Sequence, residues 1–119
     1  MNASRKVVVV TGAGRGIGRA ICERLSGDGW RVACADIAEQ ENQETAALVR
    51  GDPVTCDVGN EDSAEALVRF VSDKYGRLDG IVSNAGINRC EPLADWTLAQ
   101  WDRIIATNLT ASFLLARAS

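Results

Sequence analysis

Histidine is absent from this chain of 119 residues, and cysteine occurs only four times. The cysteines are Cys22, Cys34, Cys56 and Cys90. Their spacing matches neither a zinc site nor a redox pair, and no histidine is present to complete a set of metal ligands. We therefore predict no metal site. Three of the cysteines fall in predicted helices or strands, where we expect them to pack as small apolar residues.

The chain also lacks basic runs, repeats, linkers and long apolar segments. Its net charge of -3 gives no electrostatic footprint for nucleic acid. The apolar run Val7–Val10 is too short for a secretory signal, and no segment approaches membrane-spanning length. The length suits one compact domain, and 46% hydrophobic residues can form its core. We expect a cytoplasmic protein that binds neither nucleic acid nor membrane.

The most informative stretch is 7–18, which reads VVVVTGAGRGIG. Four consecutive valines are stiff and apolar, and they suit a strand that is covered on both faces. The glycines allow a tight turn and a close approach to a bulky anion. A helix that begins near Gly16 would direct its free N–H groups and the positive end of its dipole at that anion. The stretch therefore predicts a phosphate site, and its setting indicates the pyrophosphate of a dinucleotide.

Asp36 supports this interpretation. It ends a second apolar stretch, Trp30–Ala35, at about the distance beyond the glycine loop where an acidic residue meets the adenosine ribose of a dinucleotide. Taken singly, a glycine-rich turn can be a plain connector, and an aspartate after a strand can be a turn residue. Together, the loop and the carboxylate favour dinucleotide binding.

Strands and helices alternate strictly along the chain, which predicts a parallel sheet with right-handed crossovers. The expected strand order is 3-2-1-4, the first half of a doubly wound sheet. After the first strand we expect strands near 31–35, 53–56 and 79–83, and helices near 16–27, 39–50, 61–75 and 98–119. Ligands bind at the carboxyl ends of such strands. The Gly12–Gly18 loop, Asp36, Asp57 and the Asn84–Gly86 loop all lie there, so their convergence predicts a single cofactor cleft.

Helix boundaries and faces also have local signals. The first helix carries an apolar stripe at four-residue spacing, Ile17, Ile21 and Leu25. Asn60 is a predicted N-cap, and Thr97–Gln100 resembles a capping box. The last helix then runs through apolar residues at the same spacing, which are Trp101, Ile105, Leu109 and Phe113.

Several motifs occur in a characteristic order. They are Thr11–Gly18 for a TGxxxGxG pattern, Asp36 after the second strand, Asp57–Val58 after the third, Asn84–Ala85–Gly86, and Asn108 in the last helix. In this order they resemble the N-terminal half of the short-chain dehydrogenase/reductase family, over essentially the whole chain. The resemblance implies a Rossmann-type fold that is incomplete at the C-terminus. It also implies an oxidoreductase that transfers hydride between NAD and an alcohol or carbonyl substrate.

The resemblance further implies how the cofactor is held. Three glycines accommodate the pyrophosphate and a neighbouring residue offers a backbone N–H; these are Gly12, Gly16, Gly18 and Ile17. Asp57 binds the adenine amino group, and Val58 gives a backbone contact. Asn84, Ala85 and Gly86 line the floor of the cofactor site and steady the sheet.

Asn108 resembles the asparagine of the family's catalytic tetrad, which holds a helix kink and a water in the proton relay. Without the family pattern, simpler interpretations are open for two of these residues. Asn84 would be a loop residue that bonds its own backbone, and Asn108 a polar residue on a helix face.

Asp36 bears on the choice of cofactor. A charged hydrogen bond to a ribose hydroxyl contributes roughly 1.5–3 kcal/mol, or about one to two decades in affinity. The same carboxylate would repel a 2′-phosphate, so we predict NAD over NADP. Arg15 leaves an alternative open, because its guanidinium could contact that phosphate or could be a solvated loop residue.

The family's chemistry needs a tyrosine, a lysine four residues later and an upstream serine. A phenol with a pKa of about 10 is a poor base at neutral pH without such help. The one tyrosine, Tyr75, is followed four residues later by Asp79, and the lysines are Lys6 and Lys74. We interpret Tyr75 as a packing residue. We therefore expect the isolated chain to bind cofactor without turning over substrate, as a fragment of a polypeptide roughly twice as long.

Two functions stay open for the parent protein. The first is an NAD-dependent oxidoreductase acting on a small alcohol or ketone. The second is a non-catalytic dinucleotide-binding module or truncated pseudoenzyme. A Tyr-x-x-x-Lys pair beyond Ser119 would distinguish these two functions.

Two further expectations concern substrate and assembly. The segment Ile87–Leu93 could touch a substrate or serve as a surface connection. The resemblance implies a homodimer or homotetramer joined through the helix that carries Asn108.

Overall fold

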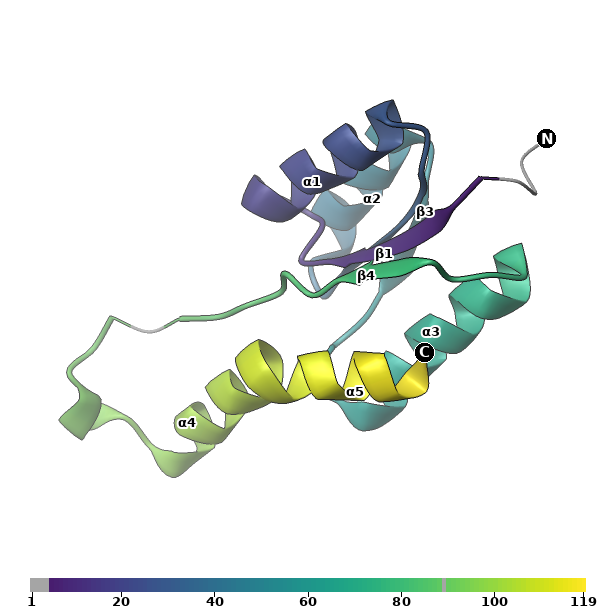
Figure 1. Cartoon of the computed structure of the whole chain (residues 1–119). Helices are drawn as coiled ribbons and strands as arrows, with labels where there is room; N and C mark the ends of the chain where they lie inside the picture. Colours follow the sequence, from purple (N-terminus) through teal and green to yellow (C-terminus); the bar gives the residue numbers. More distant parts are fainter. Residues whose placement is uncertain (1–4, 89) are drawn as a thin grey trace.

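The computed structural model describes residues 5–88 and 90–119. Figure 1 shows a parallel sheet of four strands with helices on both faces. The strands are β1 (Val7–Thr11), β2 (Arg31–Asp36), β3 (Asp52–Thr55) and β4 (Gly80–Val82). Their order is β3-β2-β1-β4, and every pairing is parallel. The predicted order and the Rossmann-like fold class are confirmed.

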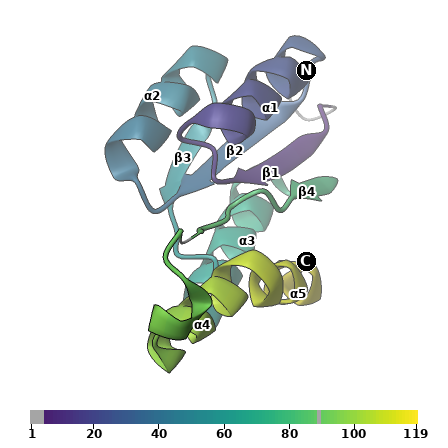
Figure 2. The same ribbon diagram turned by 90° about the vertical axis from the view of Figure 1, so that its left-hand side faces the viewer.

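The helices form two layers, which Figure 2 shows from the side. The helices are α1 (Gly16–Gly27), α2 (Glu39–Val49), α3 (Glu61–Tyr75), α4 (Leu98–Ile105) and α5 (Ala111–Ala118). A π-helical segment, Ala106–Thr110, joins α4 to α5, and a short 3₁₀ turn, Leu93–Asp95, precedes α4. Among the described residues, no helix is both long and apolar enough to cross a bilayer.

The valine run of β1 is buried throughout because the strand has a helical layer on each side. Side chains alternate between the two faces of a strand. Val7 and Val9 accordingly join the core with α3 and α5, whereas Val8 and Val10 join the core with α1 and α2. This two-sided burial explains why the strand is a continuous apolar run rather than an alternating pattern.

The apolar stripe predicted for α1 is only partly correct. Ile21 and Leu25 pack against the core, but Ile17 is 73% exposed. The buried residues of this helix are Gly18 and Cys22. The first turn of α1 borders an open cleft instead of the core, so the apolar side chain of Ile17 faces out there.

The predicted caps of the two later helices are confirmed. Asn60 accepts a hydrogen bond from the Ser63 N–H at 2.9 Å at the start of α3. At the start of α4, Thr97 and Gln100 form the reciprocal pair of a capping box. The buried face of the last helical run differs from the predicted spacing. Trp101, Leu109 and Phe113 are exposed, and the buried positions are Thr107, Ala111, Leu114 and Leu115.

Three of the cysteines are buried, as expected for packing residues. Cys22 of α1 and Cys34 of β2 place their sulfurs 3.9 Å apart, and the contact with Cys22, together with burial, raises the pKa of Cys34. Cys56 lies just beyond β3 rather than in it, and burial raises the pKa of its thiol. Over residues 5–88 and 90–119, no group of three His, Cys, Asp or Glu side chains is placed to hold a metal ion.

Asp79 lies just before β4 and ties the start of this strand to β1. Its contacts lead us to expect that the stability of the fold depends on pH. Its carboxylate pairs with the Arg77 guanidinium at 2.6 Å and accepts the Val7 N–H at 2.8 Å. The Arg77 hydrogen bonds, followed by the Val7 N–H, lower the pKa of Asp79. Its contribution is therefore present at neutral pH and is lost as pH falls below about 4, through the lowered pKa.

We accordingly expect Asp79→Asn to lower the free energy of unfolding at neutral pH, with the difference from wild type shrinking in acid. Urea unfolding followed by circular dichroism between pH 3 and pH 7, about the range over which a carboxyl titrates, measures this. Asp73→Asn, an exposed change on α3, is the matched control. If the free energy of unfolding of Asp79→Asn were lower than that of wild type by the same amount at every pH in this range, the stabilising role of the Asp79 carboxylate would be contradicted.

Candidate functional site

The carboxyl ends of the strands enclose a cleft of about 410 Å³. This volume lies within the range of small-molecule and cofactor sites. Most residues that the sequence predicted for the cofactor line it. They are Gly12, Arg15, Gly16, Ile17, Asp36, Asp57, Val58, Asn84, Ala85 and Gly86. The predicted convergence is thus present in the structure, while Gly18 and Asn108 lie beside the cleft rather than in its lining.

The glycine loop leaves room for an anion at the start of α1. Gly12 and Gly16 have φ of 64° and 58°, the left-handed region in which only glycine is unstrained. Arg15 is the N-cap of α1 but makes no side-chain cap, and the first turn holds no acidic residue. Because the first N–H groups of a helix have no partner within it, this end of α1 fits a phosphate group.

Gly18 is buried in the first turn of α1 and controls how closely the helix approaches β1. A Cβ at this position would run into the carbonyl oxygen of Gly12 and would lie 2.7 Å from the Asn84 side-chain nitrogen. The absence of a side chain at Gly18 therefore allows the loop to pack against the helix, although Gly18 itself does not line the cleft.

Asn84 ties the loop after β4 to the loop after β1. Its side-chain N–H₂ donates to the carbonyl oxygens of Thr11 at 3.2 Å and Gly12 at 3.3 Å. The Thr11 hydroxyl oxygen accepts from the backbone N–H of Asn84 at 2.9 Å and of Ala85 at 3.0 Å. Asn84 thus bonds across to the neighbouring strand rather than to its own backbone, and it holds two walls of the cleft together.

Asp36 lies at the end of β2 and is half-buried. One carboxylate oxygen accepts the Gly14 N–H at 2.8 Å, and the other accepts the Ala38 N–H at 2.9 Å. Each carboxylate oxygen can accept more than one hydrogen bond. Asp36 can therefore fix the glycine loop and still accept bonds from ribose hydroxyls.

Asp57 meets a residue that the sequence did not single out. The Arg103 Nη1 of α4 lies 3.0 Å from each Asp57 oxygen, and Asp57 Oδ1 also accepts the Gly59 N–H at 3.1 Å. Thr107, one helical turn beyond Arg103, lines the same cleft. The four-residue spacing of Arg103 and Thr107 was the available signal, but only the fold shows which side of the helix faces Asp57.

Asn108 lies in the π-helical segment and contacts Ile87 rather than the cleft. Its Oδ1 accepts the Ile87 N–H, and its Nδ2 donates to the Ile87 carbonyl, both at 2.8 Å. The pair of bonds holds the helix against the segment that follows β4. Single-turn π segments within α-helices often occur at functional sites.

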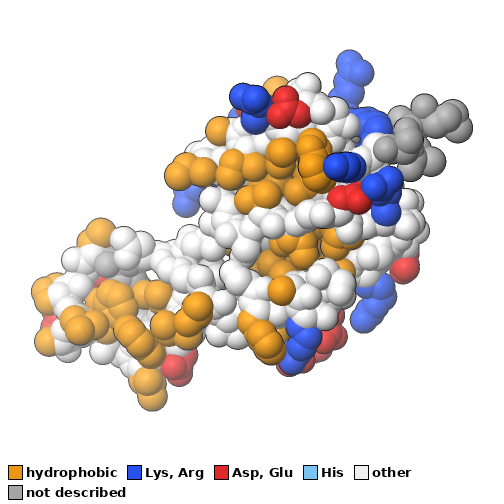
Figure 3. All heavy atoms as spheres, viewed as in Figure 1, with side chains coloured by type: hydrophobic (Ala, Val, Ile, Leu, Met, Phe, Trp, Pro, Cys, Tyr) orange, Lys and Arg blue, Asp and Glu red, His pale blue; other side chains and the backbone are white. Residues whose placement is uncertain are grey.

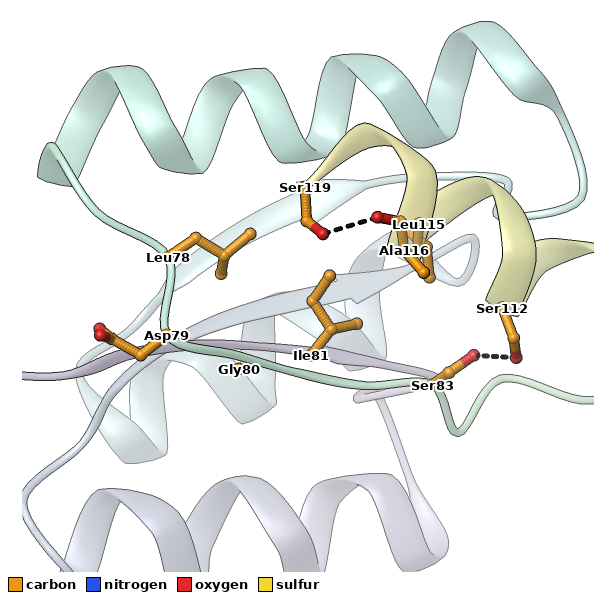
Figure 4. A pocket seen from close by; sticks show the side chains of 9 residues that line it. All are labelled: Leu78, Asp79, Gly80, Ile81, Ser83, Ser112, Leu115, Ala116 and Ser119. Carbon is orange, nitrogen blue, oxygen red and sulfur yellow. Dashed lines mark hydrogen bonds between the residues drawn. The ribbon is translucent and has the colours of Figure 1, made fainter.

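A second hollow, of about 340 Å³, lies between β4 and α5 (Figure 4). Leu78 and Ile81 point from the β4 side toward α5, and the Ser83 and Ser112 hydroxyls bond each other at 2.9 Å. The other polar side chains of its lining also have protein partners, since the Ser119 hydroxyl donates to the Ala116 carbonyl and Asp79 pairs with Arg77 and the Val7 N–H. The strand-end cleft is therefore the better ligand site.

These features define a Rossmann-like nucleotide-binding fold. Residues 6–119 match the family model described as short chain dehydrogenase. The chain is 36% identical over 118 residues to D-threitol dehydrogenase of Mycolicibacterium smegmatis, and 32% identical over 117 residues to levodione reductase of Leifsonia aquatica. These alignments cover 95% and 92% of this chain. The chain belongs to the short-chain dehydrogenase/reductase family, whose members are oxidoreductases that use a nicotinamide cofactor.

Solved structures agree with this assignment. A metagenomic short-chain oxidoreductase in complex with NADP superposes with a TM-score of 0.90 at 35% identity, covering 99% of this chain and 56% of that one. The chain covers 45% of the threitol dehydrogenase and 44% of the levodione reductase. It thus spans about half the length of the relatives that it matches.

Proposed function

We propose that this chain is the dinucleotide-binding half of a single NAD-dependent oxidoreductase domain, which acts on a small alcohol or ketone. One observation carries the proposal: a glycine-rich helix start, the aspartate that ends β2, an aspartate after β3 and the Asn84–Gly86 loop line one cleft. When bound, the nicotinamide would accept or donate the hydride, and the residues of this chain would hold and orient the dinucleotide.

Each wall of the cleft has a role in this proposal. The start of α1 holds the pyrophosphate through Gly12, Gly16 and the Ile17 N–H, and Gly18 supports this loop from behind. Asp36 accepts the ribose hydroxyls. Asp57 and Val58 contact the adenine, and Asn84, Ala85 and Gly86 form the floor. Gly18 and Asn84 act by keeping the loop in place, since their contacts are with Gly12 and the end of β1.

The preference for NAD over NADP rests on Asp36. Its carboxylate is already held by two backbone N–H groups, so it presents a fixed negative charge where a 2′-phosphate would have to lie. Arg15 is exposed and lines the same cleft, which keeps the alternative of phosphate binding open to test. One solved relative was crystallised with NADP, so the cofactor proposed for this chain differs from the cofactor bound in that structure.

The chain alone is proposed to bind the cofactor without turnover. Tyr75 packs against the core on α3, with the Arg31 guanidinium carbon 4.9 Å from its ring centroid, and it does not line the cleft. Asn108 would take its part in catalysis by positioning Ile87 and the segment after β4. The alternative function, a non-catalytic dinucleotide-binding module, shares the cleft and lacks only the reaction.

Self-association is part of the proposal for the parent enzyme. Figure 3 shows hydrophobic side chains gathered over α4 and the segment before it. Leu98, Trp101, Leu109 and Phe113 are among the exposed residues of this helical run. A homodimer or homotetramer joined through the helix that carries Asn108 would cover them. The cytoplasmic location stays a prediction.

Titrating the chain with NADH and with NADPH, followed by calorimetry, tests the binding proposal. We expect NADH to bind about 10- to 100-fold more tightly, the range that a charged hydrogen bond accounts for. Failure to bind either cofactor would overturn the function, and tighter binding of NADPH would overturn the cofactor preference alone. A Tyr-x-x-x-Lys pair encoded beyond Ser119 would favour the oxidoreductase over the non-catalytic module.

A further inference from the structure

Helix α4 projects from the body of the molecule, and none of its residues is buried (Figure 1). It nevertheless reaches the cleft through one side chain. Arg103 spans from α4 to the loop after β3, where it forms an ion pair with Asp57. An exposed ion pair contributes only about 0–1 kcal/mol to stability. Its position beside the cleft therefore suggests a role in ligand binding.

The surroundings of the guanidinium are shaped to admit it. A Cβ on Gly59 would lie 3.2 Å from Arg103 Nη1 and 3.3 Å from the Ala106 Cβ, so a larger residue would crowd the pair. The backbone N–H of the same glycine donates to Asp57 Oδ1. The turn after Asp57 thus both admits the arginine and helps to hold the carboxylate.

The two carboxylate oxygens of Asp57 accept different numbers of hydrogen bonds. Oδ1 accepts from Arg103 Nη1 and from the Gly59 N–H, whereas Oδ2 accepts from Arg103 Nη1 alone. A carboxylate oxygen has about two acceptor sites. Oδ2 therefore keeps the larger acceptor capacity. Arg103 Nη1 and the Gly59 N–H hold the carboxylate at two points, which restricts the position of Oδ2.

From this we infer that Arg103 is a positioning residue for the adenine end of the cofactor: it orients Asp57 so that Oδ2 accepts from the adenine amino group. The inference rests on the proposed function. It gives the cleft a specificity for the amino group itself. Hypoxanthine carries a carbonyl oxygen at that position, and this oxygen would face the Asp57 acceptor without a proton between them.

AMP and IMP test the inference, because they differ at this position and need no nicotinamide chemistry. For the wild-type chain we expect calorimetry to show AMP binding about 10-fold or more tightly than IMP. Arg103→Gln should reduce that ratio to less than about threefold, because the Asp57 carboxylate is no longer held. Arg103→Lys keeps the charge and should restore part of the ratio.

Arg117→Gln is the matched control. Arg117 forms a comparable ion pair with Glu61 at 2.6 Å, between α5 and α3 and away from the cleft lining. The AMP-to-IMP ratio of this variant should equal that of wild type. A role of Arg103 in holding α4 alone would weaken AMP and IMP equally and leave their ratio unchanged.

The outcomes separate this inference from the proposed function. NADH binding together with an AMP preference that persists undiminished in Arg103→Gln overturns the role of Arg103 and leaves the function standing. Equal binding of AMP and IMP by the wild-type chain overturns it as well. Absence of NADH and AMP binding overturns the function, and this inference with it. Loss of the preference in Arg103→Gln, but not in Arg117→Gln, supports it.

Discussion

Gly18→Ala is expected to weaken NADH binding by at least about 100-fold, equivalent to about 2.7 kcal/mol. The added Cβ would run into the Gly12 carbonyl oxygen, a backbone atom that can move only if the turn between β1 and α1 moves with it. Overpacking of a buried site typically costs about 1–3 kcal/mol in addition. Both effects fall on the loop that is proposed to hold the pyrophosphate, and NADH titration by calorimetry measures the first.

Gly27→Ala provides the control within the same helix. A Cβ at Gly27 meets no atom within 4 Å, and this end of α1 is distant in sequence from the loop. We expect wild-type NADH affinity and unchanged or slightly higher stability, since alanine favours helix over glycine by up to about 1 kcal/mol. Wild-type affinity in Gly18→Ala would show that the loop does not form the cofactor site.

The sequence was most informative where local chemistry and tertiary position coincide. The valine run suits a strand that is covered on both faces, and the glycines after it allow a tight turn, so β1 and the start of α1 were predictable. The side chains of Asn60 and Thr97 form caps by accepting hydrogen bonds from backbone N–H groups three residues later. Such signals do not depend on the rest of the fold.

Residues that act across the fold were less predictable. The apolar spacing of Trp101, Leu109 and Phe113 marks an exposed face, because α4 has no buried residue and the core instead takes the other side of the following helical run, at Thr107, Ala111, Leu114 and Leu115. The π-helical segment coincides with the two hydrogen bonds between Asn108 and Ile87, which lie 21 residues apart in the chain. Arg103 and Asp57 are 46 residues apart, and no local pattern in the sequence relates them.

Asp36→Ala is expected to weaken NADH binding by about 10- to 100-fold and to narrow or reverse the preference over NADPH. The substitution removes the acceptor for the ribose hydroxyls and the charge that would repel a 2′-phosphate. It also leaves the Gly14 and Ala38 N–H groups without their carboxylate partner, so part of the loss reflects a less ordered glycine loop. Parallel titrations with NADH and NADPH separate the loss of the carboxylate from the disorder of the loop. Disorder of the loop weakens the binding of both cofactors, whereas loss of the carboxylate changes the ratio of their affinities.

Glu41→Ala is the matched control for charge, since Glu41 is a second carboxylate on the lining of the same cleft. It lies in the first turn of α2, beyond the end of β2, and in the part of the chain that the structure describes its carboxylate forms no hydrogen bond with the glycine loop, unlike that of Asp36. We expect the ratio of NADH to NADPH affinity to stay at the wild-type value. If Glu41→Ala shifted the ratio as far as Asp36→Ala, the preference would arise from the summed charge of the cleft rather than from a specific bond to the ribose.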